Sequence, residues 1–117
     1  MVVFVACLST GKGTWGHVSR LIQDGKWEKV YLITNAYGKE NFNKDEKTEL
    51  IEVNMQQGLK ELRDEMKGKL DGKLDGEVAV NFVSGTGREH MALVSALLQL
   101  GVGIRLIALT KDGVEEV

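Results

Sequence analysis

The segment Val2–Gly16, with the sequence VVFVACLSTGKGTWG, runs from a continuous apolar stretch into a glycine-rich loop. Its first part, Val2–Leu8, shows no alternation with polar residues, which is typical of a strand covered on both faces in a parallel sheet. Apolar residues then recur at helical spacing, so we expect a helix over Thr14–Gln23 that stops near Gly25. A buried strand, a glycine loop and a helix in this order predict the first unit of a parallel α/β sheet.

A second segment repeats this order of elements. We expect a strand over Val78–Val83, a loop over Ser84–Arg88 with the sequence SGTGR, and a helix over Arg88–Leu100 that ends at Gly101. In an open α/β sheet the ligand lies beyond the carboxyl ends of the strands, where the chain reverses direction between two neighbouring strands. The two glycine loops are therefore predicted to lie side by side at that point.

The remaining elements complete the predicted sheet. We expect five strands in the order 3-2-1-4-5, with helices on both faces and right-handed crossovers. An Asp-Gly pair at Asp112 predicts a turn into a short antiparallel strand. The other expected elements are strands over Lys29–Thr34, Thr48–Asn54 (at an edge) and Ile104–Leu109, a short irregular helix within Asn35–Lys47, a helix over Met55–Leu70, a solvated loop over Gly68–Glu77, and the final strand Val114–Val117.

Length and composition restrict the class of protein. The 117 residues fit one domain of the common size of about 100–150 residues, so we expect a single domain over 1–117. Glycine accounts for 14 residues and proline for none, which excludes collagen-like and proline-rich chains. A net charge of −2 argues against a duplex-DNA binder. No apolar run reaches the roughly 18 residues of a membrane helix, so we expect a soluble, cytoplasmic protein without membrane contact.

The first loop has the residue types of a phosphate site. Glycines allow the backbone N–H groups at the start of a helix to approach a phosphate closely, and Gly11, Gly13 and Gly16 satisfy the pattern G-x-G-x-x-G. Lysine adds a positive charge, and serine and threonine add hydroxyl donors. The candidate ligand-binding residues of this loop are Ser9, Thr10, Gly11, Lys12, Gly13 and Thr14.

Two specific nucleotide sites are disfavoured. A dinucleotide site requires an acid near the end of the second strand, where this chain has Thr34-Asn35-Ala36. A Walker loop requires Ser or Thr directly after Gly-Lys, where this chain has Gly13. The alternative of a strand-to-helix turn that binds nothing stays open, because such turns are common in α/β folds.

The second loop adds further candidates, namely Ser84, Gly85, Thr86, Gly87 and Arg88. We expect Ser84 to cap the following helix and Arg88 to bind a phosphate with two parallel hydrogen bonds. His17 and His90 each fall in the first turn of a helix, where a histidine acts as a general base or as a packing residue. The acids show no metal-ligand spacing, and the lone Cys7 excludes an internal disulfide, so we expect no metal and no cofactor.

With both loops placed, the chain resembles the CRISPR-associated Rossmann fold (CARF) family, the cyclic oligoadenylate sensors of type III CRISPR systems. The resemblance lies in VVFVACLSTGKGTWGHVSRLI, the following KVYLIT, and VNFVSGTGREHMALVSALLQLGVGIRLIALTKDG. Arg88 and Met91 occupy positions where that family has a basic residue and an early helical methionine. The loop reads Ser-Gly-Thr-Gly-Arg where the family has Thr-Gly-Gly-Thr-Lys. The expected fold is therefore a three-layer, Rossmann-like α/β domain.

The resemblance implies a function and a set of residues. CARF domains form two-fold dimers in which the glycine loops of both subunits surround one crevice, so it implies a homodimer that binds cyclic tetra- or hexa-adenylate. The two loops would contact the ring, and Asn35 and Tyr37 would contact an adenine. Some members cleave the ring without a metal, by attack of a ribose 2′-OH on the adjacent phosphate. Catalytic candidates for that step are Ser9, Lys12, Arg88 and His90.

Members of the family usually carry an effector after the sensor, and this chain stops at Val117, so we expect either a sensor-only form or one whose effector has been lost or left out. Such a form suits a protein that binds or degrades the messenger. Two other classes stay open. One is a general Rossmann-type nucleotide-binding protein or enzyme subunit, and the other is an interaction module whose glycine turns are structural.

Overall fold

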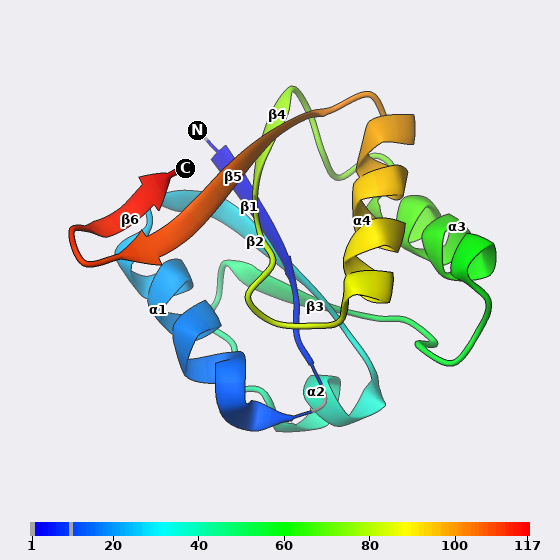
Figure 1. Ribbon diagram of the computed structural model, residues 1–117, viewed down its shortest axis with the longest axis horizontal. Helices are drawn as coiled ribbons and strands as arrows, with labels where there is room; N and C mark the ends of the chain where they lie inside the picture. The colour runs from blue at the N-terminus through cyan, green and yellow to red at the C-terminus, as the bar shows by residue number, and fades with distance from the viewer. Residues whose placement is uncertain (1, 10) are drawn as a thin grey trace.

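A computed structural model describes residues 2–9 and 11–117 of the chain (Figure 1). Strands and helices alternate from the N-terminus, as in a parallel α/β sheet. The elements are β1 (Val2–Cys7), a 3-10 turn η1 (Lys12–Thr14), α1 (Trp15–Asp24), β2 (Trp27–Thr34), α2 (Ala36–Asn41), β3 (Thr48–Glu52), α3 (Leu59–Leu70), β4 (Glu77–Asn81), α4 (Gly87–Gln99), β5 (Gly103–Thr110) and β6 (Gly113–Glu116).

The six strands form one sheet in the order β3-β2-β1-β4-β5-β6. Strands β1 to β5 are parallel to their neighbours, and β6 pairs antiparallel with β5 after a turn at Gly113. The predicted order and the antiparallel final strand are both confirmed. Strand β1 lies between β2 and β4, so the segments that follow β1 and β4 leave the sheet at the same edge.

Alternating side chains of β1 divide the core into two layers. Phe4 and Ala6 pack on the face covered by α1, whereas Val5 and Cys7 pack on the face covered by α3 and α4. Figure 1 shows this arrangement, with α1 on one side of the sheet and α3 and α4 on the other. A strand without polar alternation is therefore buried on both faces, as its sequence predicts.

Two predicted boundaries move for identifiable reasons. Helix α3 begins at Leu59 rather than Met55, because Asn54 folds the chain into a turn by accepting a hydrogen bond from the Gln56 N–H (2.9 Å). Strand β4 ends at Asn81 rather than Val83. The Asn81 side chain donates to the Ile107 carbonyl (2.7 Å) and accepts from the Val83 N–H (3.0 Å), which replaces the strand ladder.

The cap of α4 corrects one prediction. Thr86, and not Ser84, is the N-cap of this helix: its side chain accepts from the Glu89 N–H, and the Glu89 carboxylate accepts from the Thr86 N–H. This reciprocal pair is a capping box, which satisfies two backbone donors at the helix start. No helix in the described part of the chain is both long and apolar enough to cross a membrane.

Candidate functional site

The side chain of Ser84 joins the two glycine loops at the carboxyl edge of the sheet. Its hydroxyl oxygen accepts from the Ser9 N–H (2.8 Å) and from the Thr14 hydroxyl (2.7 Å). Ser84 is 1% exposed, so these bonds lie beneath the surface. The hydroxyl that was expected to cap α4 therefore ties the first loop to the second, and the predicted proximity of the loops is direct contact.

Further hydrogen bonds fix the shape of the first loop. The Ser9 hydroxyl donates to the Gly11 carbonyl (2.8 Å), and the indole N–H of Trp15 donates to the Ser9 carbonyl (3.0 Å). Trp15 is buried, and its ring meets Phe42 edge to face at 5.6 Å. The indole therefore anchors the loop from below. Thr10, also expected to bind ligand, lies outside the described residues.

Lys12 extends from the first loop over two aromatic rings. Its Nζ lies 5.7 Å from the centre of the Trp15 ring and 5.9 Å from that of Tyr37, within the range of cation–π attraction. Tyr37 is 42% exposed and belongs to α2, whose N-cap is Asn35. The Asn35 side chain accepts from the Gly38 N–H (3.0 Å) and so holds the first turn of α2. Of these two expected ligand contacts, Tyr37 therefore lies beside Lys12 of the first loop, and Asn35 holds the helix that carries Tyr37.

The second loop adopts a backbone conformation at position 85 that favours glycine. Gly85 has a φ of +105°, and a Cβ on it would lie 3.0 Å from the His90 Nε2 and 3.1 Å from the Cys7 Cβ. The His90 Nε2 lies 2.7 Å from the Ser84 carbonyl oxygen, so this nitrogen carries the proton and donates. His90 therefore holds the second loop through its Nε2–H, which leaves Nδ1 as the ring nitrogen outside this bond.

Arg88 is exposed on the first turn of α4 and reaches the segment before α3. Its guanidinium donates to the Met55 carbonyl (3.1 Å) and to the Gln57 carbonyl. Neither acceptor carries a full charge, and Arg88 has no ion-pair partner among the described residues. An arginine carries five N–H donors, so it can hold these carbonyls and still attract an anion.

Two further reactive side chains, those of Cys7 and His17, lie in the core and beside an apolar cavity. Burial raises the pKa of the Cys7 thiol to about 12, with a further rise from the nearby Glu89 carboxylate, so Cys7 is a neutral core side chain near pH 7. His17 lies beside an apolar cavity of about 340 Å³ that Phe82 and Leu106 also line. Across residues 2–9 and 11–117, no three His, Cys, Asp or Glu side chains gather where they would hold a metal ion.

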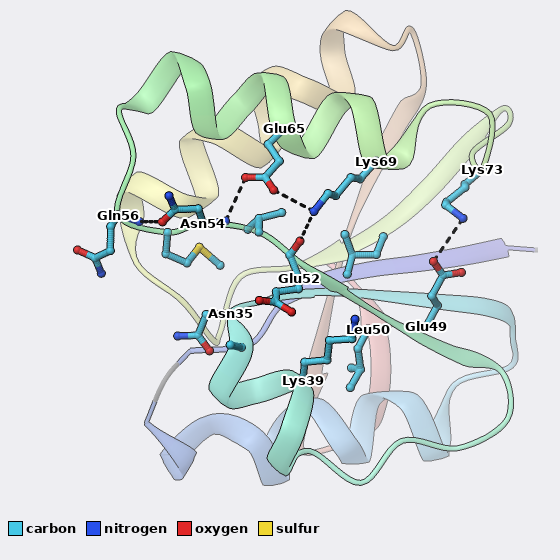
Figure 2. Close-up of a pocket in the computed structure, with 14 residues that line it drawn as sticks. Asn35, Lys39, Glu49, Leu50, Glu52, Asn54, Gln56, Glu65, Lys69 and Lys73 are labelled. Carbon is cyan, nitrogen blue, oxygen red and sulfur yellow. Dashed lines mark hydrogen bonds and ion pairs between the residues drawn. The ribbon is translucent and has the colours of Figure 1, made fainter.

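A groove that the sequence did not predict follows the outer edge of β3. It has a volume of about 720 Å³ and lies between α2 and α3 (Figure 2). Its lining combines the carboxyl ends of β2 and β3 with charged side chains of the flanking helices. The one sequence signal was the polar run Asn54-Met55-Gln56-Gln57 between an edge strand and a helix. The lining includes Asn35, Lys39, Glu49, Leu50, Glu52, Asn54, Met55, Gln56, Glu65, Lys69 and Lys73.

Glu65 stabilises one side of this groove through hydrogen bonds and an ion pair. Its carboxylate accepts from the Asn54 N–H (3.0 Å) and the Gln57 side chain (2.5 Å), and it pairs with Lys69 (2.9 Å). Burial acts to raise the pKa of Glu65, but the hydrogen bonds from Lys69, Asn54 and Gln57, with the charge of Lys69, outweigh it. The pKa of Glu65 therefore lies below its ordinary value of 4.5.

This lowered pKa predicts a specific loss of stability in acid. A carboxyl whose pKa is lower in the folded state stabilises the fold above its unfolded pKa, and the stabilisation disappears as the pH falls through the folded pKa. We expect Glu65→Gln to cost about 1 kcal/mol at pH 7, with the difference from wild type shrinking below about pH 4.5. Thermal unfolding from pH 7 to pH 3 measures this, with Glu61→Gln on the same helix as control. A difference that stays constant with pH would contradict the assignment.

Comparison with known proteins supports the fold. No family model matches the sequence, and no curated protein matches it either. Among solved structures, the chain is similar to Enterococcus italicus Csm6 bound to cyclic hexa-2′-fluoro-hexa-dAMP, with a TM-score of 0.62 and 11% identity. The match covers 95% of this chain and 34% of Csm6, so the chain spans about a third of the length of that protein. At this identity the likeness concerns the fold, which is a Rossmann-like α/β sheet with an antiparallel final strand.

Proposed function

We propose that this chain binds a cyclic oligoadenylate at the carboxyl edge of its sheet, with ring phosphates against the first and second loops. The observation that carries the proposal is the pair of glycine loops joined through Ser84. Four of their five glycines, Gly11, Gly13, Gly16 and Gly87, have no positive φ and no described atom within 4 Å of a Cβ position. The fold does not need glycine there, whereas a phosphate that approaches the main chain does.

The charges of the two loops suit the same ligand. Lys12 lies on the first loop and Arg88 at the end of the second. The nearest acid in the sequence is Glu89, and the capping box of α4 uses its carboxylate. Both loops lead into helix starts, where the N–H groups that the capping box of α4 does not use favour negative charge. The loops therefore present positive potential and donors to one region.

A ring of phosphates with two-fold symmetry would match two copies of this edge, so the proposal includes a homodimer around one ring. The sequence resemblance to CARF domains supports it. The structural likeness to Csm6 supports the binding of a ring, because that structure holds a cyclic hexanucleotide. The general nucleotide-binding alternative has less support, since β2 ends at Thr34 and is followed by Asn35 rather than by an acid.

The proposal also includes cleavage of the bound ring. A ribose 2′-OH would attack the adjacent phosphate, and the protein would align the ring and stabilise the developing charge. Three of the four catalytic candidates already bond within the protein: Ser9 to Gly11, Arg88 to two carbonyls and His90 to Ser84. Lys12 is the charged candidate whose described contacts are aromatic rings alone. We therefore expect tight binding with slow, metal-independent cleavage.

Lys12→Ala is expected to weaken ring binding about tenfold, the loss of one charge-assisted contact to phosphate. Isothermal titration calorimetry with cyclic tetra-adenylate and cyclic hexa-adenylate measures the affinity, and chromatography in the presence of EDTA detects linear products. Lys29→Ala is the matched control, because Lys29 also lies over an aromatic ring, that of Tyr31, but near the amino end of β2. Its affinity should equal that of the wild type.

Two results would overturn the proposal. One is a dissociation constant above about 100 μM for both rings. The other is thermal stabilisation by NAD or S-adenosylmethionine without any by the rings, which would favour the general nucleotide-binding class.

A further inference from the structure

The side chain of Arg88 is bound differently from those of the other three arginines. Each of those pairs with at least one carboxylate, and they are Arg20, Arg63 and Arg105. Arg88 has no carboxylate partner among the described residues, and its two terminal nitrogens donate to the main-chain carbonyls of Met55 and Gln57. A carboxylate neutralises a guanidinium, whereas a carbonyl orients it and leaves its charge uncompensated. Arg88 is therefore fixed in place with a free positive charge.

The two carbonyls belong to the turn that follows β3, at the edge of the sheet where the glycine loops also lie. Strands β3, β1 and β4 are parallel, so the segments that follow them leave the sheet at the same edge. Arg88 comes directly after the second loop, in the first turn of α4. Its guanidinium therefore links the second loop to the turn after β3. The two bonds leave the Nε–H and one N–H of each terminal nitrogen for an anion.

One carboxylate oxygen on α3 holds this turn. The Oε1 of Glu65 accepts from the Asn54 N–H (3.0 Å) and from the side-chain N–H of Gln57 (2.5 Å), whereas its Oε2 pairs with Lys69 (2.9 Å). Figure 2 shows the Glu65 carboxylate with its interactions toward Asn54 and Lys69. Gln57 therefore contacts Glu65 through its side chain and Arg88 through its carbonyl, so that a single residue separates the carboxylate from the guanidinium.

We propose that Glu65 is a positioning residue of the ring site: it fixes the turn after β3, and the carbonyls of that turn hold the Arg88 guanidinium for a ring phosphate. This inference rests on the proposed function. An arginine side chain loses rotamer freedom when it binds a ligand, and fixing it beforehand removes part of that cost. Glu65 itself touches no ligand in this assignment. Its whole effect on ring affinity therefore passes through Arg88.

The test is a double-mutant cycle in ring affinity, measured by calorimetry with cyclic tetra- and hexa-adenylate well below the unfolding temperature. Arg88→Ala should weaken binding about tenfold, the loss of one charge-assisted contact. Glu65→Ala should weaken it about three- to fivefold, because Arg88 is then no longer held in advance. The double variant should bind no more weakly than Arg88→Ala alone. Asp64→Ala, which removes an exposed carboxylate of the same helix that pairs with Arg63, is the control and should bind as wild type.

The conservative variant Glu65→Gln separates positioning from stability. Its amide oxygen can replace Oε1 as the acceptor for the turn, whereas its amide nitrogen cannot pair with Lys69. Glu65→Gln should therefore lose stability and keep most of the ring affinity. A second measurement needs no ring: ¹⁵N relaxation of the Arg88 Nε–H, assigned by its absence in Arg88→Ala, should show more motion in Glu65→Ala than in wild type or Glu65→Gln.

The outcomes separate this inference from the proposed function. A loss of affinity from Glu65→Ala that persists in the Arg88→Ala background would overturn the positioning role, because Glu65 would then act by another route. Unchanged binding by Arg88→Ala, with binding still weakened by Lys12→Ala, would also overturn it and leave the ring site standing. Equal losses of affinity in Glu65→Ala and Glu65→Gln would contradict it as well. A wild type that binds neither ring would remove both proposals.

Discussion

Replacing Gly85 with alanine is expected to destabilise the protein by about 2–3 kcal/mol, because the new Cβ meets two costs at once. The φ of +105° is a conformation that alanine rarely adopts. The Cβ would also lie 3.0 Å from the Glu89 carboxylate oxygen and the His90 Nε2, and 3.1 Å from the Cys7 Cβ. Cys7 is fully buried in β1, so that contact cannot relax by moving a side-chain end into solvent.

The matched control for this substitution is Gly87→Ala, two residues further along. Gly87 opens α4 without a positive φ and with open space at its Cβ position. Alanine there should stabilise the protein by about 0.5 kcal/mol, by restricting the unfolded chain and favouring the helix. Urea unfolding measures both variants. Equal stability of Gly85→Ala and Gly87→Ala would show that the second loop relaxes freely, against the geometry described.

The sequence predicts the sheet because each strand carries its own pattern. Val2–Leu8 and Val78–Val83 read as buried strands, and the glycine loops after them mark where two neighbouring strands end. Parallel crossover rules then leave few strand orders. The capping box was also readable, since Thr86-Gly87-Arg88-Glu89 has the pattern of Ser or Thr followed three residues later by Glu. Ser84, which we expected to cap the helix, lies two residues before the N-cap position of this pattern.

The partners of the site residues follow no local pattern. Arg88 bonds to carbonyls of Met55 and Gln57, more than thirty positions earlier in the chain, and the sequence spacing carries no trace of this contact. The β3 groove has the same origin. It forms because β3 is the edge strand and because Asn54–Gly58 turns before α3, so that α3 lies beside the edge strand. The apolar periodicity predicts that the helix already begins at Met55, so it does not indicate this turn.

Ser84→Ala is expected to cost about 2 kcal/mol and to weaken ring binding, because it removes the oxygen that joins the two loops. The part-buried Ser9 N–H would lose its acceptor, while the Thr14 hydroxyl could turn toward the Ser9 Oγ, 3.4 Å away. A double-mutant cycle with Thr14→Val should therefore give a coupling energy of about 1 kcal/mol for the Ser84–Thr14 bond. Chemical unfolding of the four proteins measures it, with Ser95→Ala, a half-buried serine of α4, as control.

The affinity for the ring then shows whether the hydrogen bonds of Ser84 serve stability alone or also ligand binding. If both loops hold the same ring, Ser84 sets their relative position, so affinity measured well below the unfolding temperature should fall in Ser84→Ala even though nearly every molecule is folded. The loss should exceed that of Thr14→Val, which leaves the Ser9 N–H bond to Ser84 in place. Lost stability with wild-type affinity would mean that each loop keeps its shape alone, and that ring binding does not depend on the contact between them.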